Sequence, residues 1–256
     1  MAAGSIAGSG QTGNNIKLVI TEANIKDILW GCHIQSPKIA AATHKYIDSL
    51  NTAMAEHSID ANRSRQAHFL AQVLHESQYL LHIEENLNYS AERLPKVFPK
   101  IEPEIAKKIA HNNEEAAKYL YFHYNTSLGN KSEDDAWHYI GRGLIQMTGK
   151  SNYAAFQKEL ESEHITTDVL KNPDLLATDP LTACRSACYF WSSHNLNHFA
   201  DLANLSDNDD KPDLLYFQKI CKTINARNEG YTSRKSLWDS AVRALKVRPL
   251  VLAKPH

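Results

Sequence analysis

The chain has 256 residues, of which 43% are hydrophobic, and a formal net charge of −1. This length and composition can bury a substantial core, which excludes an intrinsically disordered protein. The near-neutral charge supplies no global basic field for nucleic acid or an anionic membrane, and the sequence contains no apolar run of about eighteen residues that would predict membrane insertion.

Residues 1–15 are rich in Gly, Ser and Asn and are predicted to form a flexible arm before one folded domain at 16–256. The first ten residues lack the charged and apolar regions of a secretory signal. We therefore expect synthesis in the cytoplasm without such a signal.

Three helices are predicted in the first third of the chain. Thr21 is suited to cap a short first helix, and Ser36-Pro37 begins a second one. The third helix covers residues 66–75 and closes at Glu76. The apolar face of the second helix is formed by Ile39, Ala42, Tyr46, Ile47, Leu50 and Met54.

The remainder of the chain also reads as mainly helical. Strand signals are confined to residues 17–20 and 143–147, which predict at most a minor β-hairpin. The expected fold class is therefore all-α. Further helices are predicted at 99–125 with a break at Pro103, at 180–192, at 212–225 and at 232–247, with a polar loop at 125–135.

The four cysteines are too few and too scattered for a disulfide framework, so we interpret them as buried structural thiols. Cys184 and Cys188 share a helical face, but a metal site would need two more soft donors nearby. The zinc-protease pattern His-Glu-x-x-His fails at Tyr79, where the second histidine would stand. No metal or organic cofactor is expected.

Two glutamates, Glu76 and Glu85, stand ahead of a polar glycine-rich segment at 141–148. Cleavage of a glycosidic bond needs one carboxyl as acid and a second as base or nucleophile, about 6.5–9.5 Å apart for direct displacement and about 5–5.5 Å apart for double displacement. A continuous helix would place Glu85 about 13.5 Å along and about 180° around from Glu76. The chain must therefore leave the helix between Ser77 and Glu84.

The motifs around these residues resemble glycoside hydrolase family 19, which contains chitinases and bacterial or phage cell-wall lysins. The resemblance covers roughly residues 66–244. It implies a mainly helical, lysozyme-like domain with two lobes, a substrate groove between them and an inverting mechanism. The motifs that carry it are His75-Glu76-Ser77, the run from Glu85 to Ser90, the run from Tyr139 to Gly149, Asn152-Tyr153, the run from Asn172 to Ala177, the helix around Ala187 to Trp191, and Thr223-Ile224-Asn225.

The resemblance also implies roles for single residues. Glu76 takes the place of the general acid, Glu85 that of the general base, and Thr148 that of the hydroxyl residue that helps to hold the attacking water. The sugar-binding positions are Gln146, Asn152 and Asn225. The chain departs from the family at Gln78 and Tyr79, where small residues are usual, and at Ala226-Arg227, which replace a glycine pair.

Several alternatives stay open at this stage. Glu84 competes with Glu85 for the role of base, and Arg234 is a candidate to steer that base electrostatically. His75 either contacts substrate or supports the site, and Tyr153 either stacks on a sugar or belongs to the core. Arg142 either contacts sugar or forms a structural ion pair.

Burial among apolar neighbours is expected to keep Glu76 protonated, whereas Glu85 is expected to be open to water and ionised. Such a pair would hydrolyse the bond in a single step with inversion.

The predicted function is that of a peptidoglycan hydrolase, an endolysin or an antibacterial effector-type lysozyme, that cleaves β-1,4 bonds between N-acetylated amino sugars. A chitinase is the first alternative, and a catalytically silent sugar-binding or interaction protein on the same fold is the second. The expected partner is peptidoglycan or chitin, together with an immunity or inhibitor protein if the chain is an antibacterial effector. The enzyme would reach the cell wall, in the periplasm or outside the cell, after lysis or export by a dedicated secretion system.

Overall fold

The computed structural model describes residues 18–203 and 210–247, and the predicted flexible arm at 1–15 lies outside this part of the chain. The described part is almost entirely helical, which confirms the predicted all-α class. Its helices are α1 (Glu22–Trp30), α2 (Pro37–Glu56), η1 (Ile59–Ala61), α3 (Arg63–Glu76), α4 (Leu94–Val97), α5 (Pro103–Ile109), α6 (Asn113–Lys118), η2 (Tyr119–Tyr124), η3 (Thr126–Leu128), α7 (Glu133–His138), α8 (Lys150–Ser162), α9 (Leu175–Thr178), α10 (Pro180–Ser193), α11 (Leu196–Leu202), α12 (Asp210–Ile224) and α13 (Tyr231–Ala244).

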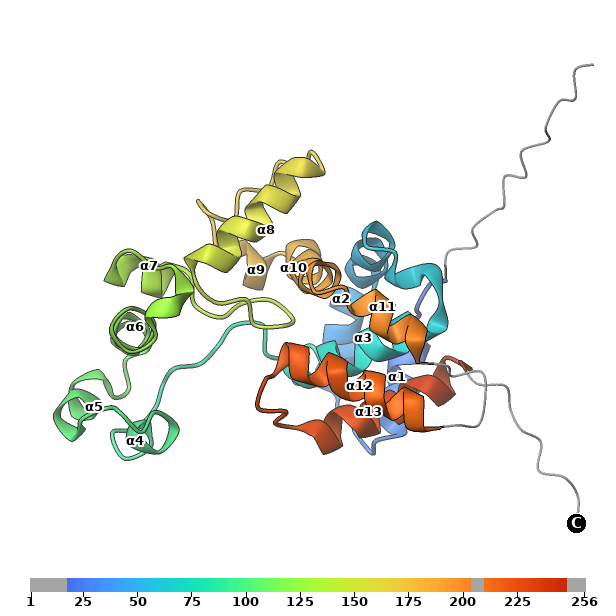
Figure 1. The fold of residues 1–256 in the computed structure, drawn as a ribbon, viewed down its shortest axis with the longest axis horizontal. Coiled ribbons are helices and arrows are strands. Elements are labelled where there is room, and N and C mark those ends of the chain that lie inside the picture. Colours follow the sequence, from blue (N-terminus) through green and yellow to red (C-terminus); the bar gives the residue numbers. More distant parts are fainter. Residues whose placement is uncertain (1–17, 204–209, 248–256) are drawn as a thin grey trace, which may run out of the picture.

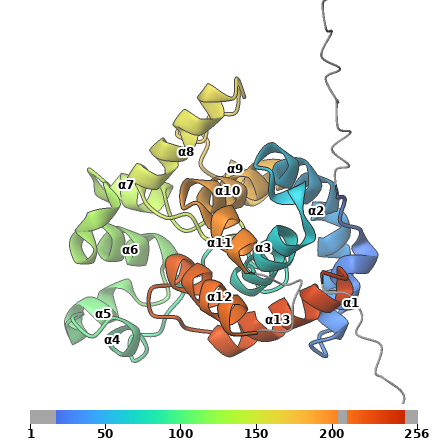
Figure 2. The same ribbon diagram turned by 45° about the vertical axis from the view of Figure 1, so that its right-hand side comes forward.

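Three hydrophobic clusters divide the molecule (Figure 1). The main lobe joins α1–α3 to α10–α13, so both ends of the described chain build one core. The small lobe contains α4–α7 and η2, and it lies on the opposite side of the picture from α1 and α13 in both views (Figures 1 and 2). The third cluster is formed mainly by α8 and α9 and by residues that lead into them.

Helices α1 and α2 of the main lobe begin where the sequence predicted. The Thr21 side chain accepts a hydrogen bond from the Asn24 amide at 3.2 Å, and Ser36 accepts one from the Lys38 amide at 3.2 Å. Each cap satisfies an amide that the first turn of a helix leaves without a partner. The predicted apolar face of α2 faces the core, with Ile39, Tyr46, Ile47, Leu50 and Met54 buried.

Helix α3 ends at Glu76, and the chain then turns sharply, as predicted. The buried Ser77 hydroxyl donates to the Val73 carbonyl at 2.6 Å and accepts from the Leu80 amide at 2.9 Å. Residues 78–80 all have positive φ angles. Left-handed backbone costs a residue with a side chain about 1–2 kcal/mol, so the buried hydroxyl and the packing of Leu80 in the main core hold a strained turn.

The strand predicted at residues 17–20 is absent from its described part, residues 18–20. Side chains, and not a second strand, form the hydrogen bonds to the backbone of this segment. Asn51 accepts from the Ile20 amide at 2.8 Å and donates to its carbonyl at 2.7 Å. Gln66 donates to the Leu18 carbonyl at 2.5 Å. This segment is thereby tied to α2 and α3.

The second strand signal, at 143–147, needs a correction of its bounds. Arg142 pairs with Met147 in an isolated antiparallel bridge, and the residues between them form the turn. Arg142 also bridges Glu84. The minor hairpin is therefore present, but it consists of single paired residues.

Other boundaries also differ from the prediction. The long helix expected at 99–125 is divided into α5, α6 and the π-helix η2, and the loop expected at 125–135 contains η3 and the start of α7. Helices α8 and α11 were not predicted, whereas α10, α12 and α13 match their predicted segments within a few residues.

The four cysteines are free thiols. Cys184, Cys188 and Cys221 are buried in the main core, which confirms the prediction for them, and Cys32 is half-buried. Burial raises the pKa of Cys188 well above its ordinary value, so this thiol stays protonated and unreactive at neutral pH. Among the described helices, none has the length and apolar character needed to cross a membrane.

Candidate active site

Glu76 stands at the end of α3, where α3 packs along α13. Its carboxylate oxygen Oε1 pairs with the Arg234 guanidinium of α13. The Glu76 side chain is 20% exposed, whereas that of Arg234 is 1% exposed. Among the described residues, Arg234 contacts Oε1 and leaves Oε2 of this carboxylate to bind another group.

Arg234 is the centre of a buried polar network. Its second nitrogen donates to the Gln72 amide oxygen at 2.7 Å, and Nε donates to the Glu229 carbonyl at 3.3 Å. A buried guanidinium is stable only when its donors are matched in this way. The prediction that Arg234 steers the base, Glu85, is corrected: its carboxylate partner is Glu76.

His75 supports the same region. Its Nδ1 lies 3.1 Å from the Ser233 hydroxyl, and its ring rests against Gly230, where an added Cβ would come within 2.3 Å of Nε2. Gly230 also has a φ of 72°. Both the close contact with His75 and this positive φ therefore favour glycine at position 230. Burial, followed by the charge of Arg234, lowers the pKa of His75 and favours the neutral ring. These contacts favour the supporting role among the two alternatives.

Glu85 is positioned by backbone pairing rather than by a helix. Its amide donates to the Gly141 carbonyl at 2.9 Å, and the Gly143 amide donates to the Ile83 carbonyl at 2.8 Å. The Glu85 carboxyl accepts hydrogen bonds from the Tyr121 hydroxyl, at 2.5 Å, and from the Gly141 amide. Two donors from different segments therefore fix one carboxyl.

Gly141 allows three functional groups to converge. A Cβ at this position would lie 3.0 Å from the Thr148 hydroxyl, 3.1 Å from the Gln146 amide oxygen and 3.2 Å from the Glu85 carboxyl carbon. All three distances are shorter than ordinary contacts, so a side chain at Gly141 would have to push these groups apart. The structure thus brings together Glu85, Gln146 and Thr148, as the sequence predicted them to act together.

The environment of Glu85 differs from the expectation. Burial raises the pKa of its carboxyl, while the hydrogen bonds from Tyr121 and Gly141 lower it by less. The expectation that Glu85 is open to water is therefore wrong. Glu76, expected among apolar neighbours, instead has an ion pair with Arg234.

Glu84 belongs to a different network. Its carboxylate lies 2.7 Å from Arg142 Nε, and another nitrogen of Arg142 lies 2.8 Å from Asp174. Arg142 also donates to the His138 carbonyl at 2.7 Å, and its side chain is 6% exposed. Of the two alternatives for Arg142, these contacts favour the structural ion pair over contact with sugar. Because neighbouring side chains of extended backbone point to opposite faces, Glu84 is directed away from Glu85.

Tyr153 does not offer a face to a sugar. It is fully buried in the third cluster, where its hydroxyl donates to the Ile140 carbonyl at 2.9 Å. The predicted substrate-binding role of Tyr153 is therefore corrected to a core role that supports the segment before Gly141.

The other predicted sugar-binding residues lie in two different segments. Asn152 is exposed, and its side chain donates to the Thr148 carbonyl at 2.7 Å, next to the Glu85 group. Asn225 follows α12 and accepts from the Arg227 amide at 3.1 Å, in the loop that carries Glu229 and Gly230 beside Arg234. Their contact with sugar stays a prediction.

Tyr121 is the functional residue that the sequence reasoning missed. It lies in η2, a π-helix with four aromatic side chains and a histidine in its six residues. Single π-helical turns often occur at functional sites, so this aromatic run after a charged helix was the available signal. Within residues 18–203 and 210–247, no three His, Cys, Asp or Glu side chains gather as ligands for a metal.

The protein is a glycoside hydrolase. Its mainly helical domain has two lobes, with one supported glutamate at the end of a core helix and a second glutamate on the loop that follows. Comparison with known proteins gives the family. A family model described as Chitinase class I matches residues 107–201. A glycosyl hydrolase family 19 domain-containing protein of Haemophilus influenzae is 34% identical over 198 residues, which cover 77% of this chain and 86% of the relative. The chain therefore belongs to glycoside hydrolase family 19.

Two further similarities are to chitinases. An acidic endochitinase of Petunia hybrida is 37% identical over 76 residues, which are 30% of this chain and 25% of that protein. The chain thus spans about a quarter of the length of this plant relative. The structural alignment with the crystal structure of chitinase C from Streptomyces griseus covers 92% of this chain and 97% of the chitinase chain. The identity is 18% and the TM-score is 0.47.

Proposed function

We propose that this glycoside hydrolase cleaves peptidoglycan, with Glu76 as general acid and Glu85 as general base in one inverting step. The observation that carries the proposal is the convergence of Glu85, Thr148 and Gln146 around Gly141. A carboxylate beside a hydroxyl can hold and deprotonate a water molecule, while an amide can bind a sugar substituent.

The raised pKa of Glu85 supports its role as base. A general base works best when its pKa is close to the working pH, because a weaker base removes a proton less readily. Burial raises this pKa, and the two hydrogen bonds from Tyr121 and Gly141 still stabilise the ionised form. These two hydrogen bonds favour the ionised carboxylate that a general base needs.

In this proposal, Glu76 enters the reaction with a proton on Oε2, the oxygen that Arg234 does not hold, and gives that proton to the oxygen of the leaving sugar. The proposal requires the two carboxyls to face each other across a groove between the main and small lobes, far enough apart for a glycan strand and one water molecule. That requires about 6.5–9.5 Å between them.

The choice of peptidoglycan is supported by the run from Glu85 to Ser90, which is similar to bacterial and phage lysins, and by the extent of the bacterial relative compared with the plant one. Chitin is the second candidate, since the matching family model and the plant relative are both described as chitinases. Both polymers contain β-1,4-linked N-acetylated amino sugars. In the peptidoglycan role, the protein would act as a lysin or as an exported effector, the latter with a matching immunity protein.

The test is digestion of purified peptidoglycan and of chitin, followed by borohydride reduction and mass spectrometry of the new ends. We expect reduced muramic acid from peptidoglycan, with the Glu76→Gln protein as an inactive control. Release of chitin oligosaccharides without any peptidoglycan product would establish the chitinase instead. Binding of either polymer without new ends would favour the silent sugar-binding protein.

A further inference from the structure

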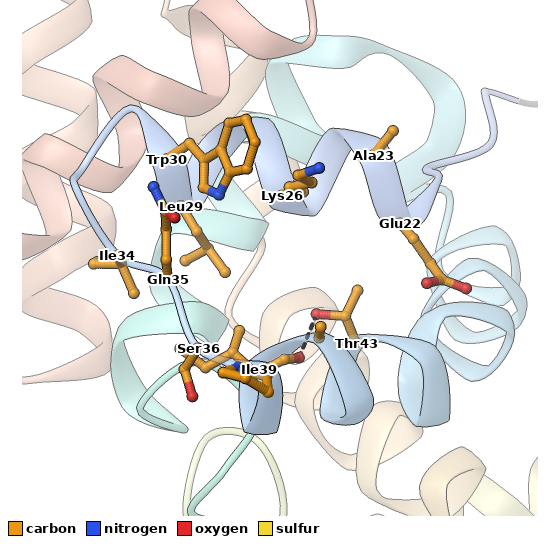
Figure 3. Close-up of a pocket in the computed structure, with 12 residues that line it drawn as sticks. Glu22, Ala23, Lys26, Leu29, Trp30, Ile34, Gln35, Ser36, Ile39 and Thr43 are labelled. Atoms are coloured by element: carbon orange, nitrogen blue, oxygen red, sulfur yellow. Dashed lines mark hydrogen bonds between the residues drawn. The ribbon is translucent and has the colours of Figure 1, made fainter.

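A pocket of about 550 Å³ lies between α1 and the first turns of α2 (Figure 3). Its inner wall is apolar and contains Leu29, Ile34 and Ile39. Trp30 stands at its edge with 47% of its surface exposed, although large apolar side chains of this lobe are mostly in the core. The volume is in the range of pockets that bind small ligands.

Polar groups surround this apolar wall. Lys26 Nζ lies 4.1 Å from the centre of the Trp30 ring, a cation–π contact that keeps both side chains at the edge of the pocket. The exposed side chain of Gln35 supplies both a hydrogen-bond donor and an acceptor. Glu22, also at the edge, is paired with His44 at 2.9 Å, so its charge is partly matched.

The pocket is remote from the proposed catalytic groups. Both views place α1 on the side of the main lobe that faces away from α4–α7, whereas Tyr121, the partner of Glu85, belongs to the small lobe (Figures 1 and 2). A molecule held beside Trp30 therefore does not lie between the two lobes.

We propose that this α1–α2 pocket, lined by Lys26, Leu29, Trp30, Ile34, Gln35 and Ile39, binds an N-acetylated sugar unit of a wall polysaccharide outside the catalytic groove. The inference rests on the proposed function, because it takes the ligand from the same polymer. The C–H face of a β-linked sugar ring and its acetamide methyl are apolar, whereas the hydroxyls and the amide lie at the ring edge. An exposed indole, an apolar wall, an ammonium and an amide match these groups in kind.

Other ligand classes fit this pocket less well. An acyl chain would fill the apolar wall but would remove water from Lys26 and Gln35 without replacing their hydrogen bonds, which is costly. A nucleic acid would need several cations, whereas this edge carries Lys26 together with the carboxylate of Glu22. The mixed apolar and polar character favours a sugar.

A second attachment point has a clear use on an insoluble polymer. When one site is bound, the other meets neighbouring strands at high effective concentration, so the enzyme stays on the wall between cleavage events. A soluble fragment too short to reach both sites gains nothing from this arrangement. The α1–α2 pocket should therefore affect binding to the polymer without affecting chemistry on short substrates.

The experiment measures co-sedimentation of the full chain with purified peptidoglycan and, separately, with chitin. All binding variants carry Glu76→Gln, so that the polymer is not digested. We expect Trp30→Ala to weaken binding by at least about tenfold, as loss of a central aromatic contact does, and Trp30→Phe to keep most of it. Leu215→Ala, at a residue that is 50% exposed on α12, is the matched surface control and should bind normally.

A second measurement separates this pocket from the catalytic site. Trp30→Ala with Glu76 intact should hydrolyse a soluble tetrasaccharide of N-acetylated amino sugars at the normal rate. Unchanged sedimentation of Trp30→Ala on both polymers would overturn the inference while leaving the proposed function standing, and so would equal losses of sedimentation and of tetrasaccharide hydrolysis. Failure of the unmodified protein to cleave either polymer would instead contradict the proposed function, and Trp30-dependent sedimentation would still support a sugar site.

Discussion

The two glutamates of the proposed active site are held in contrasting ways. Glu76 ends a long core helix, and its partner Arg234 lies on a second helix packed along the first. Glu85 lies on a loop, where backbone pairing to Gly141 and a hydroxyl from the small lobe hold it in place. One carboxyl therefore depends on the main core, and the other depends on contacts between lobes.

This contrast predicts different responses to substitution. Changes around Glu76 should reduce stability together with activity, because the groups that hold it are buried in the main lobe. Changes around Glu85 should alter the pH dependence of catalysis with little effect on folding, because its partners lie at the junction of short segments.

The largest effect is expected from the carboxyls themselves. Glu76→Gln and Glu85→Gln should each lower turnover by about 10²–10⁴-fold, since each removes one proton-transfer step. Steady-state hydrolysis of purified peptidoglycan and chitin measures this loss. Glu84→Gln is the matched control and should have a mild effect, because Glu84 pairs with Arg142 and not with the groups around Glu85. A Glu84→Gln protein that is impaired while Glu85→Gln stays active would assign the base to Glu84.

Arg234→Met should destabilise the protein by about 3 kcal/mol, because it leaves Gln72 and Glu76 without their buried partner. The partial exposure of Glu76 keeps the loss toward the low end of the range for buried pairs. Urea denaturation measures the change, and Arg227→Met, at an exposed arginine of the preceding loop, is the control. A fully stable Arg234→Met protein would show that the network does not support α3 and α13.

Acid should weaken the main lobe through His68 of α3, which is fully buried between the rings of Phe217 and Trp238. Burial lowers the pKa of His68 from 6.5 to about 4, more than its hydrogen bond to the Ser64 carbonyl and the charge of Asp201 raise it. The folded state therefore prefers the neutral ring. The contribution of neutral His68 to the free energy of unfolding is complete above pH 6.5 and is lost as the pH falls toward 4.

This loss should amount to about 2 kcal/mol between pH 8 and pH 5, as measured by urea denaturation at each pH. His68→Phe should remove most of that pH dependence, whereas His82→Gln, at an exposed histidine, should leave it unchanged. An identical pH profile for His68→Phe and the unmodified protein would refute the assignment.

The smallest effect is expected at Tyr121. Tyr121→Phe removes a hydrogen bond that lowers the pKa of Glu85, so that pKa should rise further and the acidic limb of kcat/KM should move to higher pH. The rate at neutral pH should fall by about tenfold, as expected for one hydrogen bond to a charged group. Tyr124→Phe, in the same π-helix and packed on Phe98, should change neither quantity. A pH profile unaffected by Tyr121→Phe would show that the hydroxyl does not tune Glu85.

The sequence predicted the parts of the fold that local patterns determine. The apolar spacing of α2, the caps at Thr21 and Ser36, and the end of α3 at Glu76 depend on residues close together in the chain. The grouping of Glu85, Gln146 and Thr148 was predicted through the family resemblance, and the structure brings these residues together around Gly141.

The contacts that decide electrostatics could not be predicted in the same way. Arg234 lies 158 residues from Glu76, and Tyr121 lies 36 residues from Glu85, so neither pairing leaves a periodic signal. The wrong expectations for Glu85 and Tyr153 share this cause, since burial depends on how distant segments meet. The division of residues 103–124 into α5, α6 and η2 likewise follows from packing in the small lobe.

The most direct test of the account is a crystal structure of the Glu76→Gln protein with a bound tetrasaccharide of N-acetylated amino sugars. The account predicts that the side chain at position 76 lies within hydrogen-bond distance of one glycosidic oxygen. It also predicts that Glu85 and Thr148 hold a water molecule on the opposite face of the adjoining sugar, with the two side chains about 6.5–9.5 Å apart. A bound sugar that meets only one of the two side chains would contradict the proposed acid/base pair.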